Sequence, residues 1–268
     1  MAISLALIGF GEAAWTFARA AHWGARARAF DLLPSRRAAM QEAGVTPCDT
    51  PADALRDAQL VLSLVTADQA LSAACAYASY LEPGAFWFDM NSVAPATKRA
   101  AADAVEQAGA HYVDVAVLAP VEPARLAVPL FVSGREAEAG AARLGEAGFT
   151  NCRTAGDEVG RASAIKMIRS VMVKGVEALT DEMMCAAQAA GVTDEVLASL
   201  DASEKAWDWT KRAAYNIERM DSHGLRRAAE MEEAARTLLW LGVDPVMTRG
   251  TIQRQRDRGS AAGEERAA

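Results

Sequence analysis

The feature that most constrains the fold is a glycine motif close to the start of the chain. Residues 9–14, with the sequence GFGEAA, follow an apolar run at residues 3–8 and open a helical pattern over residues 13–22. A strand, a glycine turn and a helix start in this order leave backbone N–H groups free to bind phosphates. A tight turn without a ligand is the alternative. From the motif we expect cofactor contacts by Gly9, Phe10, Gly11, Glu12 and Ala13.

Asp31 ends the next predicted strand and gives the glycine motif a partner. An acidic side chain there accepts hydrogen bonds from both ribose hydroxyls of an adenosine, although Asp is also common as a cap. Taken with the motif, it predicts a bound dinucleotide. The carboxylate repels a 2′-phosphate, which favours NAD over NADP. Ser35, Arg36 and Arg37 follow, and they could hold that phosphate or form a solvated helix face.

Short apolar runs alternate with amphipathic segments through the first half of the chain. Strands are predicted over residues 3–8, 45–48, 60–65, 86–89, 112–116, 130–133 and 151–154, and a further strand is predicted to end at residue 31. Helices are predicted over residues 13–22, 36–43, 69–81, 94–108 and 136–147. This alternation predicts right-handed crossovers and a mainly parallel sheet. We therefore expect residues 1–157 to form a doubly wound α/β Rossmann domain.

The pattern after residue 156 is helical only. Helices are predicted over residues 158–190, 192–200, 202–217 and 226–241, and the charged tail from Gln253 is expected to fray. Residues 158–268 are thus expected to form an all-α domain that starts with a long interdomain helix. Because that helix has apolar residues on more than one face, we expect a homodimer that buries them.

Composition narrows the class of protein further. A net charge of -7 argues against a nucleic-acid partner. The cysteines lie too far apart for a metal or disulfide pattern, which indicates a reducing cytoplasm and no metal site. The apolar start lacks the basic segment of a signal peptide, and no apolar stretch is long enough to span a bilayer. We expect a cytoplasmic protein with a small-molecule substrate and no membrane partner.

The long predicted helix carries a polar stripe. Lys166, Ser170 and Lys174 recur at helical spacing along one face, with Arg169 beside them. Such a stripe is usually just solvated, and nothing within the helix itself excludes that interpretation.

The chain resembles the β-hydroxyacid dehydrogenase family, which includes 3-hydroxyisobutyrate and 6-phosphogluconate dehydrogenases. The resemblance extends over roughly residues 3–190 and rests on several segments in the family's order. They are residues 9–11, 88–95 (FDMNSVAP), 112–117 (YVDVAV), 131–134 (FVSG), and Gly160 with Lys166. It implies an NAD(P)-dependent dehydrogenase.

The resemblance also implies roles for individual residues. Lys166 would be the general acid/base, bonded to the oxygen that is oxidised or reduced while hydride moves to or from nicotinamide C4. Ser92 would be the second catalytic residue, a hydroxyl close to nicotinamide and substrate. Asn91 belongs to the nicotinamide-side segment. Val65 and Thr66 would end a strand above which the cofactor's ribose and adenine lie.

The sequence departs from the family at its substrate contacts. The family usually has Ser-Gly-Gly where this chain has Leu118, Ala119 and Pro120, and usually Asn where it has Ser170. The reaction type is retained, but the usual small hydroxy acid is put in doubt. We expect substrate contacts from Leu118, Ala119, Pro120, Arg169, Ser170 and His223.

The C-terminal part resembles a bacterial domain of uncharacterised role, most clearly over residues 223–233. His223 could transfer a proton or bind an anion there, and Arg226 or Arg227 could grip a carboxylate or phosphate. A helix start with an exposed, salt-bridged face is the alternative.

Three functions are compatible with these patterns. The first is a dehydrogenase that exchanges hydride between nicotinamide and the CH–OH or C=O group of a polar hydroxy acid. The second is an imine reductase, a class with similar architecture that generally lacks lysine at the catalytic position. The third is a non-catalytic NAD(P)-binding sensor, which would need neither Lys166 nor Ser92.

Overall fold

The computed structural model describes residues 4–203 and 206–267. Residue 3 of the first predicted strand and residues 204 and 205 of the helix predicted over 202–217 lie outside this part. The chain divides into two compact units, Met1–Ser170 and Val171–Ala268. The domain boundary expected after residue 157 falls just before the long helix, whose first turns belong to the first unit.

The first unit is built on an eight-stranded sheet, in the order β3-β2-β1-β4-β5-β6-β7-β8. Neighbouring strands are parallel except β6 and β7, which pair antiparallel. The strands are β1 (Leu5–Ile8), β2 (Ala27–Phe30), β3 (Thr46–Pro47), β4 (Leu60–Ser63), β5 (Phe86–Asp89), β6 (His111–Val117), β7 (Leu130–Ser133) and β8 (Cys152–Gly156).

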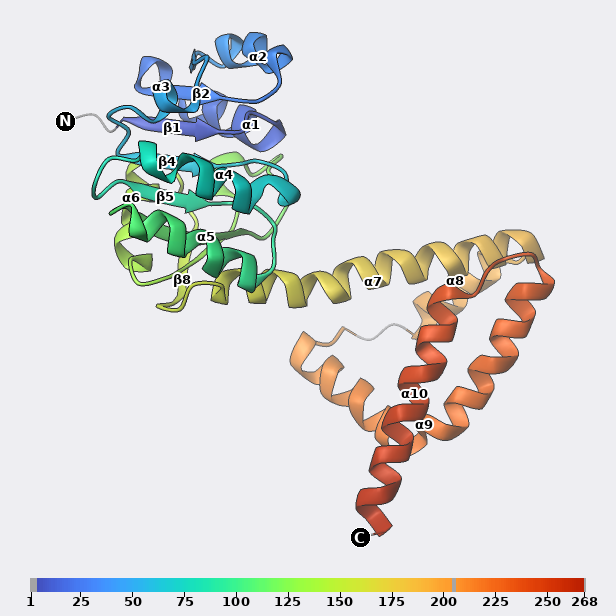
Figure 1. Cartoon of the computed structure of the whole chain (residues 1–268). Helices are drawn as coiled ribbons and strands as arrows, with labels where there is room; N and C mark the ends of the chain where they lie inside the picture. Colours follow the sequence, from blue (N-terminus) through green and yellow to red (C-terminus); the bar gives the residue numbers. More distant parts are fainter. Residues whose placement is uncertain (1–3, 204–205, 268) are drawn as a thin grey trace. The chain divides into compact units, whose positions relative to one another are not determined.

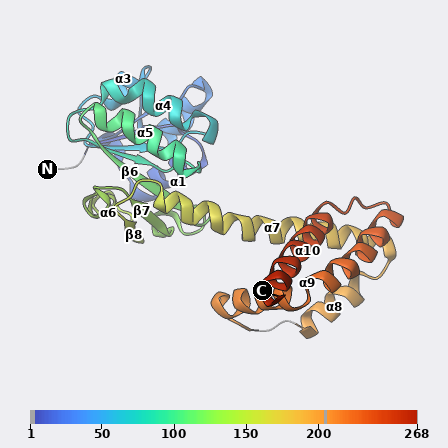
Figure 2. The same cartoon turned by 60° about the horizontal axis from the view of Figure 1, so that its bottom comes forward.

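Helices cover both faces of the sheet (Figures 1 and 2). On one face, Phe17 of α1 and Leu144 of α6 are buried in the core. On the other face, Leu55 of α3, Ala74 of α4 and Val105 of α5 are buried in the core. The helices of this unit are α1 (Glu12–Ala21), α2 (Arg37–Glu42), α3 (Pro51–Leu55), α4 (Ala70–Tyr77), α5 (Pro95–Gln107) and α6 (Ala137–Glu146).

The predicted doubly wound Rossmann domain is confirmed. All residues of β1, β4 and β5 are buried, as expected for parallel strands covered on both faces. The sequence interpretation missed the short helix α3, which Thr50 caps by accepting the Asp53 N–H at 3.1 Å. Short 3₁₀ turns connect several elements: η1 (Gly24–Arg26), η2 (Pro34–Arg36), η3 (Ala67–Gln69), η4 (Ala78–Tyr80) and η5 (Arg125–Ala127).

The second unit is helical, which confirms the predicted all-α class. Its elements are the later part of α7 (Arg161–Ala190), α8 (Thr193–Ser203), α9 (Trp209–Trp240) and α10 (Val246–Ala267). Two expectations were wrong: α9 is one helix where a break was predicted between residues 217 and 226, and the tail from Gln253 is part of α10. No helix in the described part of the chain is long and apolar enough to cross a membrane.

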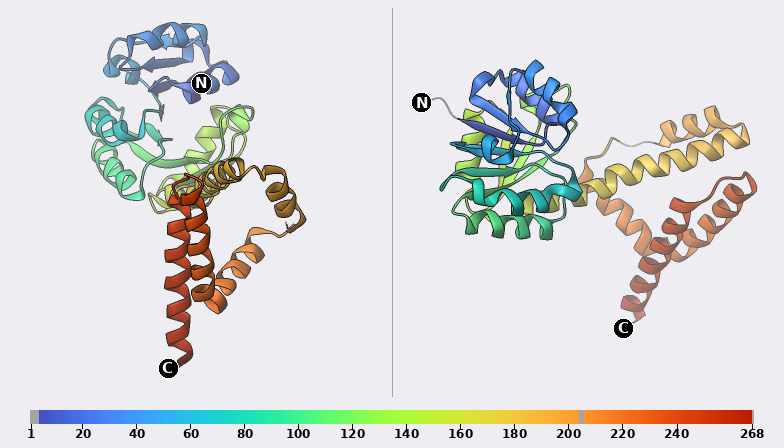
Figure 3. Two further views of the ribbon diagram at one scale, coloured as in Figure 1. Left: turned by 90° about the vertical axis from the view of Figure 1, so that its right-hand side faces the viewer. Right: turned by 45° about the horizontal axis from the view of Figure 1, so that its top comes forward.

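Both corrections have a physical cause in the contact between α9 and α10, which run side by side (Figure 3). Gly224 weakens helix propensity in the middle of α9, but it is where the α10 backbone passes closest. A Cβ on Gly224 would lie 2.9 Å from Gly259 Cα, and one on Gly259 would lie 2.6 Å from the Leu225 nitrogen. Arg258 adds a bidentate ion pair to Asp221, at 2.8 and 2.9 Å.

Glu182 of α7 caps the start of α10 within the second unit. Its carboxylate accepts the N–H groups of Met247 and Thr248 at 2.6 and 2.9 Å and the Thr248 hydroxyl at 2.6 Å. Burial opposes ionisation of this carboxyl group. The hydrogen bonds from Thr248 and Met247 outweigh burial, however, and hold the pKa of Glu182 below its ordinary value.

This cap predicts an acid-sensitive second unit. Because the pKa of Glu182 is lower in the folded than in the unfolded state, its stabilisation is present above pH 4.5 and is lost as the pH falls through the folded value. We expect Glu182→Gln to lower the free energy of unfolding by about 1–2 kcal/mol at neutral pH and by less near pH ~3. Urea unfolding followed by circular dichroism measures this, with the exposed Glu195→Gln on α8 as control. An equal loss at both pH values would contradict the assignment.

Candidate active site

The turn between β1 and α1 has the geometry that the glycine motif predicts. Gly9 has a φ of 89°, and a Cβ there would lie 2.6 Å from the Leu64 carbonyl oxygen, so that only glycine fits. Gly11 stands at the N-cap of α1 and uses no side chain to cap the helix. Ala14 is fully buried and allows α1 to lie close to the sheet. The first turn of α1, with Glu12 and Ala13, therefore presents free N–H groups to an anion.

Asp31 lies directly after β2 and is fixed by two backbone hydrogen bonds. Its Oδ2 accepts the Phe10 N–H at 2.7 Å, and its Oδ1 accepts the Leu33 N–H at 2.8 Å. The carboxylate thus holds the glycine turn. Each oxygen retains a further lone pair that can accept a hydrogen bond from a ribose hydroxyl.

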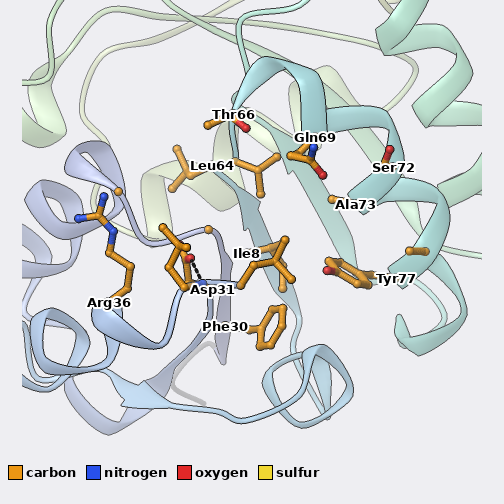
Figure 4. A pocket seen from close by; sticks show the side chains of 16 residues that line it. Ile8, Phe30, Asp31, Arg36, Leu64, Thr66, Gln69, Ser72, Ala73 and Tyr77 are labelled. Carbon is orange, nitrogen blue, oxygen red and sulfur yellow. Dashed lines mark hydrogen bonds between the residues drawn. The ribbon is translucent and has the colours of Figure 1, made fainter.

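A pocket of about 440 Å³ opens beside Asp31 at the ends of β1, β2 and β4 (Figure 4). In this view Asp31 lies between Arg36 on one side and the rings of Phe30 and Tyr77 on the other. The two rings meet edge to face, with centroids 6.1 Å apart. The pocket includes Val65 and Thr66, the residues predicted to lie under the cofactor's adenosine half. Its largely apolar wall suits a planar base.

The two residues predicted to be catalytic meet at the next part of the same sheet edge. Ser92 follows β5, and Lys166 lies in the second turn of α7. The Lys166 Nζ donates a hydrogen bond to the Ser92 Oγ at 2.5 Å. Lys166 is only partly exposed. Lys166 therefore has a specific partner in the segment that follows β5, in addition to its place on the polar face of the helix.

Asn91 supplies an unused acceptor next to Ser92. Its side chain is 5% exposed, and its Nδ2 donates to Ser63 Oγ at 3.0 Å and Asp89 Oδ1 at 2.7 Å. Its Oδ1 is buried without a hydrogen-bond partner among the described residues. A buried acceptor of this kind normally has a donor, so the arrangement fits a cofactor hydroxyl or amide at this position.

The structure also contains a buried polar cluster that sequence reasoning missed. Lys98 of α5, which is fully buried, bonds Asp89 Oδ1 at 2.9 Å and approaches Asp114 Oδ1 at 3.3 Å. Tyr112 donates to Asp89 Oδ2 at 2.7 Å. Burial and the neighbouring Asp89 carboxylate raise the pKa of Tyr112 well above its ordinary value. Carboxylates inside otherwise apolar strands are the signal that could have revealed this cluster.

The predicted substrate residues fall in three places. Leu118, Ala119 and Pro120 follow β6 directly, and the last two are exposed. Arg169 and Ser170 lie one turn beyond Lys166 on α7. His223 belongs to the second unit, inside α9, so its predicted role stays a prediction. No group of side chains in the described ranges could hold a metal ion.

Comparison with known families identifies the first unit. A model of the NAD binding domain of 6-phosphogluconate dehydrogenase matches residues 4–144, more than half of the chain. The chain therefore belongs to this NAD-binding family, and its fold is that of a dehydrogenase-like Rossmann protein. A second model, of a domain of unknown function, matches residues 187–257 in the helical part.

Solved structures extend the similarity over nearly the whole chain. A conserved hypothetical protein from Sinorhizobium meliloti is 39% identical, with 97% of this chain and 90% of that chain covered and a TM-score of 0.64. A conserved protein of unknown function, described as structurally similar to 3-hydroxyacid dehydrogenases, is 31% identical, with 97% and 98% covered and a TM-score of 0.63.

Imine reductases share the fold at lower identity. The enzyme from Myxococcus stipitatus in complex with NADP⁺ is 19% identical, with 96% of this chain and 94% of that chain covered and a TM-score of 0.79. A variant of the same enzyme in complex with NAD⁺ is 16% identical, with 97% and 95% covered and a TM-score of 0.77.

Proposed function

We propose that this protein is an NAD(P)-dependent oxidoreductase that exchanges hydride between nicotinamide and the CH–OH or C=O carbon of a polar, hydroxy acid-like substrate. The observation that carries the proposal is the 2.5 Å hydrogen bond between Lys166 Nζ and Ser92 Oγ. It joins a proton carrier to the segment that follows β5, in a domain whose family binds NAD. The 31% identical protein that is described as structurally similar to 3-hydroxyacid dehydrogenases supports the same class of enzyme.

Lys166 is the proton-transfer group of the proposed reaction. A bound nicotinamide cofactor would supply the hydride acceptor or donor at its C4. In oxidation the neutral Lys166 amine takes the proton of the substrate hydroxyl, and in reduction the ammonium returns a proton to the carbonyl oxygen. Ser92 accepts a hydrogen bond from Lys166, so its own hydroxyl hydrogen can point to the same substrate oxygen. Two groups thereby orient one oxygen.

The cofactor site divides between two parts of the sheet edge. Gly9, Gly11 and the start of α1 would hold the pyrophosphate, and Asp31 would hold the adenosine ribose. Asn91 would accept a hydrogen bond on the nicotinamide side, which gives its buried Oδ1 a donor. Both sets of residues fit a dinucleotide that crosses from β2 to β5.

We propose NAD as the preferred cofactor. Asp31 is tied to two backbone N–H groups and therefore holds its charge where a 2′-phosphate would approach. Arg36 also lines the pocket and is the residue that would favour NADP instead.

The substrate contacts differ from those of the usual small hydroxy acids. A Ser-Gly-Gly loop offers a hydroxyl group and several backbone N–H groups to a carboxylate. In this chain Pro120 has no backbone N–H, and the side chains of Leu118 and Ala119 have no hydrogen-bond donor. We propose that Arg169 takes over the carboxylate, because it follows Lys166 by about one turn on the same helix and a guanidinium can bind a carboxylate with two hydrogen bonds.

Cofactor preference is tested with Asp31→Ala. We expect this change to weaken NADH binding by roughly 10- to 100-fold and NADPH binding much less, because a ribose acceptor and a repulsive charge are lost together. Fluorescence titration of each nucleotide measures both affinities. Asp103→Ala is the matched control, since Asp103 is an exposed carboxylate on α5, away from the pocket beside Asp31. An unchanged preference would remove Asp31 from the site.

Catalysis is tested with Lys166→Ala. A screen of hydroxy acids, amines and phosphorylated polyols, followed by NADH or NADPH absorbance, first supplies a substrate. We then expect kcat to fall by roughly 10²- to 10⁴-fold with nucleotide affinity nearly unchanged. Oxidation by the wild type should rise with pH, and this rise should vanish in the variant. Lys211→Ala, an exposed lysine on α9, is the control. Near-normal turnover would disprove the mechanism.

Imine reduction is the second candidate function, and the fold shared with imine reductases favours it. The same screen decides, because an imine reductase would turn over cyclic imines but not hydroxy acids. A nucleotide-binding sensor would turn over neither.

We also propose a homodimer formed mainly by the second unit. Apolar side chains of α7 remain exposed there: Val171 is 76% exposed, and Met172, Val176 and Leu179 are each about half exposed. Exposed apolar surface of this extent on one helix usually marks an interface. Light scattering at micromolar concentration should show a dimer, and Val171→Asp combined with Val176→Asp should shift it to the monomer. A stable wild-type monomer would refute the proposal.

A further inference from the structure

The start of α7 is held by a carboxylate from the sheet. Asp114 Oδ2 accepts the N–H groups of Gly160 and Ser163 at 3.1 and 3.0 Å, and its Oδ1 accepts the Ser163 hydroxyl at 2.7 Å. Ser133 adds a hydrogen bond to Asp114 Oδ2 at 3.0 Å and accepts the Ala162 N–H at 2.9 Å. Asp114 therefore caps α7 from another element and fixes where the helix begins.

The segment that carries Ser92 is held in a similar way. Asp89 Oδ1 accepts both the backbone N–H of Asn91 at 3.0 Å and its side-chain Nδ2 at 2.7 Å. Ser92 is the next residue. Lys98 then joins the two carboxylates, with its ammonium on the carbonyl oxygen of Asp89 at 2.6 Å and between Asp89 Oδ1 and Asp114 Oδ1.

One continuous chain of buried groups thus links the two catalytic candidates from inside the protein. It leads from Ser92 through Asn91 and Asp89 to Lys98, and on through Asp114 to Ser163 in the first turn of α7. Lys166 follows Ser163 by three residues on the same helix. Asp89, Lys98 and Asp114 are at most 1% exposed. Charges so deeply buried tolerate few alternative arrangements.

We propose that Asp114 is a positioning residue: by fixing the start of α7, it holds Lys166 within hydrogen-bond distance of Ser92. Lys98, which is bonded to both Asp89 and Asp114, connects it to the segment that carries Ser92. The importance of this position for catalysis rests on the proposed function. The positioning itself can be tested without substrate or nucleotide. The charged and polar side chains that face Asp114 include Lys98 from α5, Ser133 from β7 and Ser163 from α7, and Tyr112 of β6 also interacts with it electrostatically.

The test measures the reactivity of Lys166 in the full-length protein. Acetic anhydride acylates neutral amines, so peptide mass spectrometry over a series of pH values gives the labelling rate of each lysine. The exposed Lys211 serves as internal reference. In Asp114→Asn we expect the rate of Lys166 relative to Lys211 to rise about two- to tenfold and its pH profile to move to lower pH, because the ammonium loses its bond to Ser92.

Two further variants separate positioning from stability. Ser163→Ala removes one hydrogen bond to Asp114 and keeps the buried charges, so we expect a smaller change in the same direction even if Asp114→Asn folds poorly. Leu144→Ala removes a buried side chain of α6 outside the polar cluster, and should lower the melting temperature without changing Lys166 labelling.

The outcomes distinguish the two proposals. Unchanged Lys166 labelling in both Asp114→Asn and Ser163→Ala, or an equal change in Leu144→Ala, would overturn the positioning role. Altered labelling in the Asp114 and Ser163 variants alone would support it. If labelling changes as expected but Lys166→Ala keeps normal turnover, the positioning geometry stands and the proposed catalytic function fails.

Discussion

One buried ammonium shared by two buried carboxylates organises the first unit. Lys98 compensates Asp89 and Asp114, which project from the neighbouring strands β5 and β6. Removing one member of such a group typically costs about 3–5 kcal/mol, since an uncompensated charge stays behind. The groups around it satisfy the remaining lone pairs, among them the Tyr112 hydroxyl and the N–H groups at the start of α7. The cluster therefore fixes strand ends and helix start together.

The candidate site follows from the order of the strands. β1 lies between β2 and β4, so the glycine turn, Asp31 and the segment after β4 meet at one edge of the sheet. Chain segments that leave a parallel sheet at a switch in strand order diverge and leave room for a ligand. β5 is the next strand along, and it carries Asn91 and Ser92 to the same edge. A dinucleotide extended along this edge would reach Lys166.

Much of this arrangement was predictable because local patterns determine it. Apolar runs predicted the buried strands, and the spacing of glycines predicted the turn at Gly9. The family resemblance implied a catalytic role for Lys166 and for Ser92 separately, and the structure brings the two into contact. The missed features depend on contacts distant in sequence. Nothing in the tail indicates that it will pack on α9, and Gly224 breaks the helical pattern unless its contact with Gly259 is known. The burial of Lys98 likewise depends on carboxylates from two other elements.

The position of Asp114 within β6 has a consequence for how such proteins diversify. Asp114 lies inside the strand and holds α7, whereas the segment 118–129 that follows the strand contributes none of the hydrogen bonds of the buried cluster. Substitutions at its exposed positions, such as Ala119 and Pro120, would change the proposed substrate contacts without removing a hydrogen bond of this cluster. A lineage could thus change the proposed substrate contacts at the exposed positions of this segment, while the buried cluster beneath them stayed unchanged.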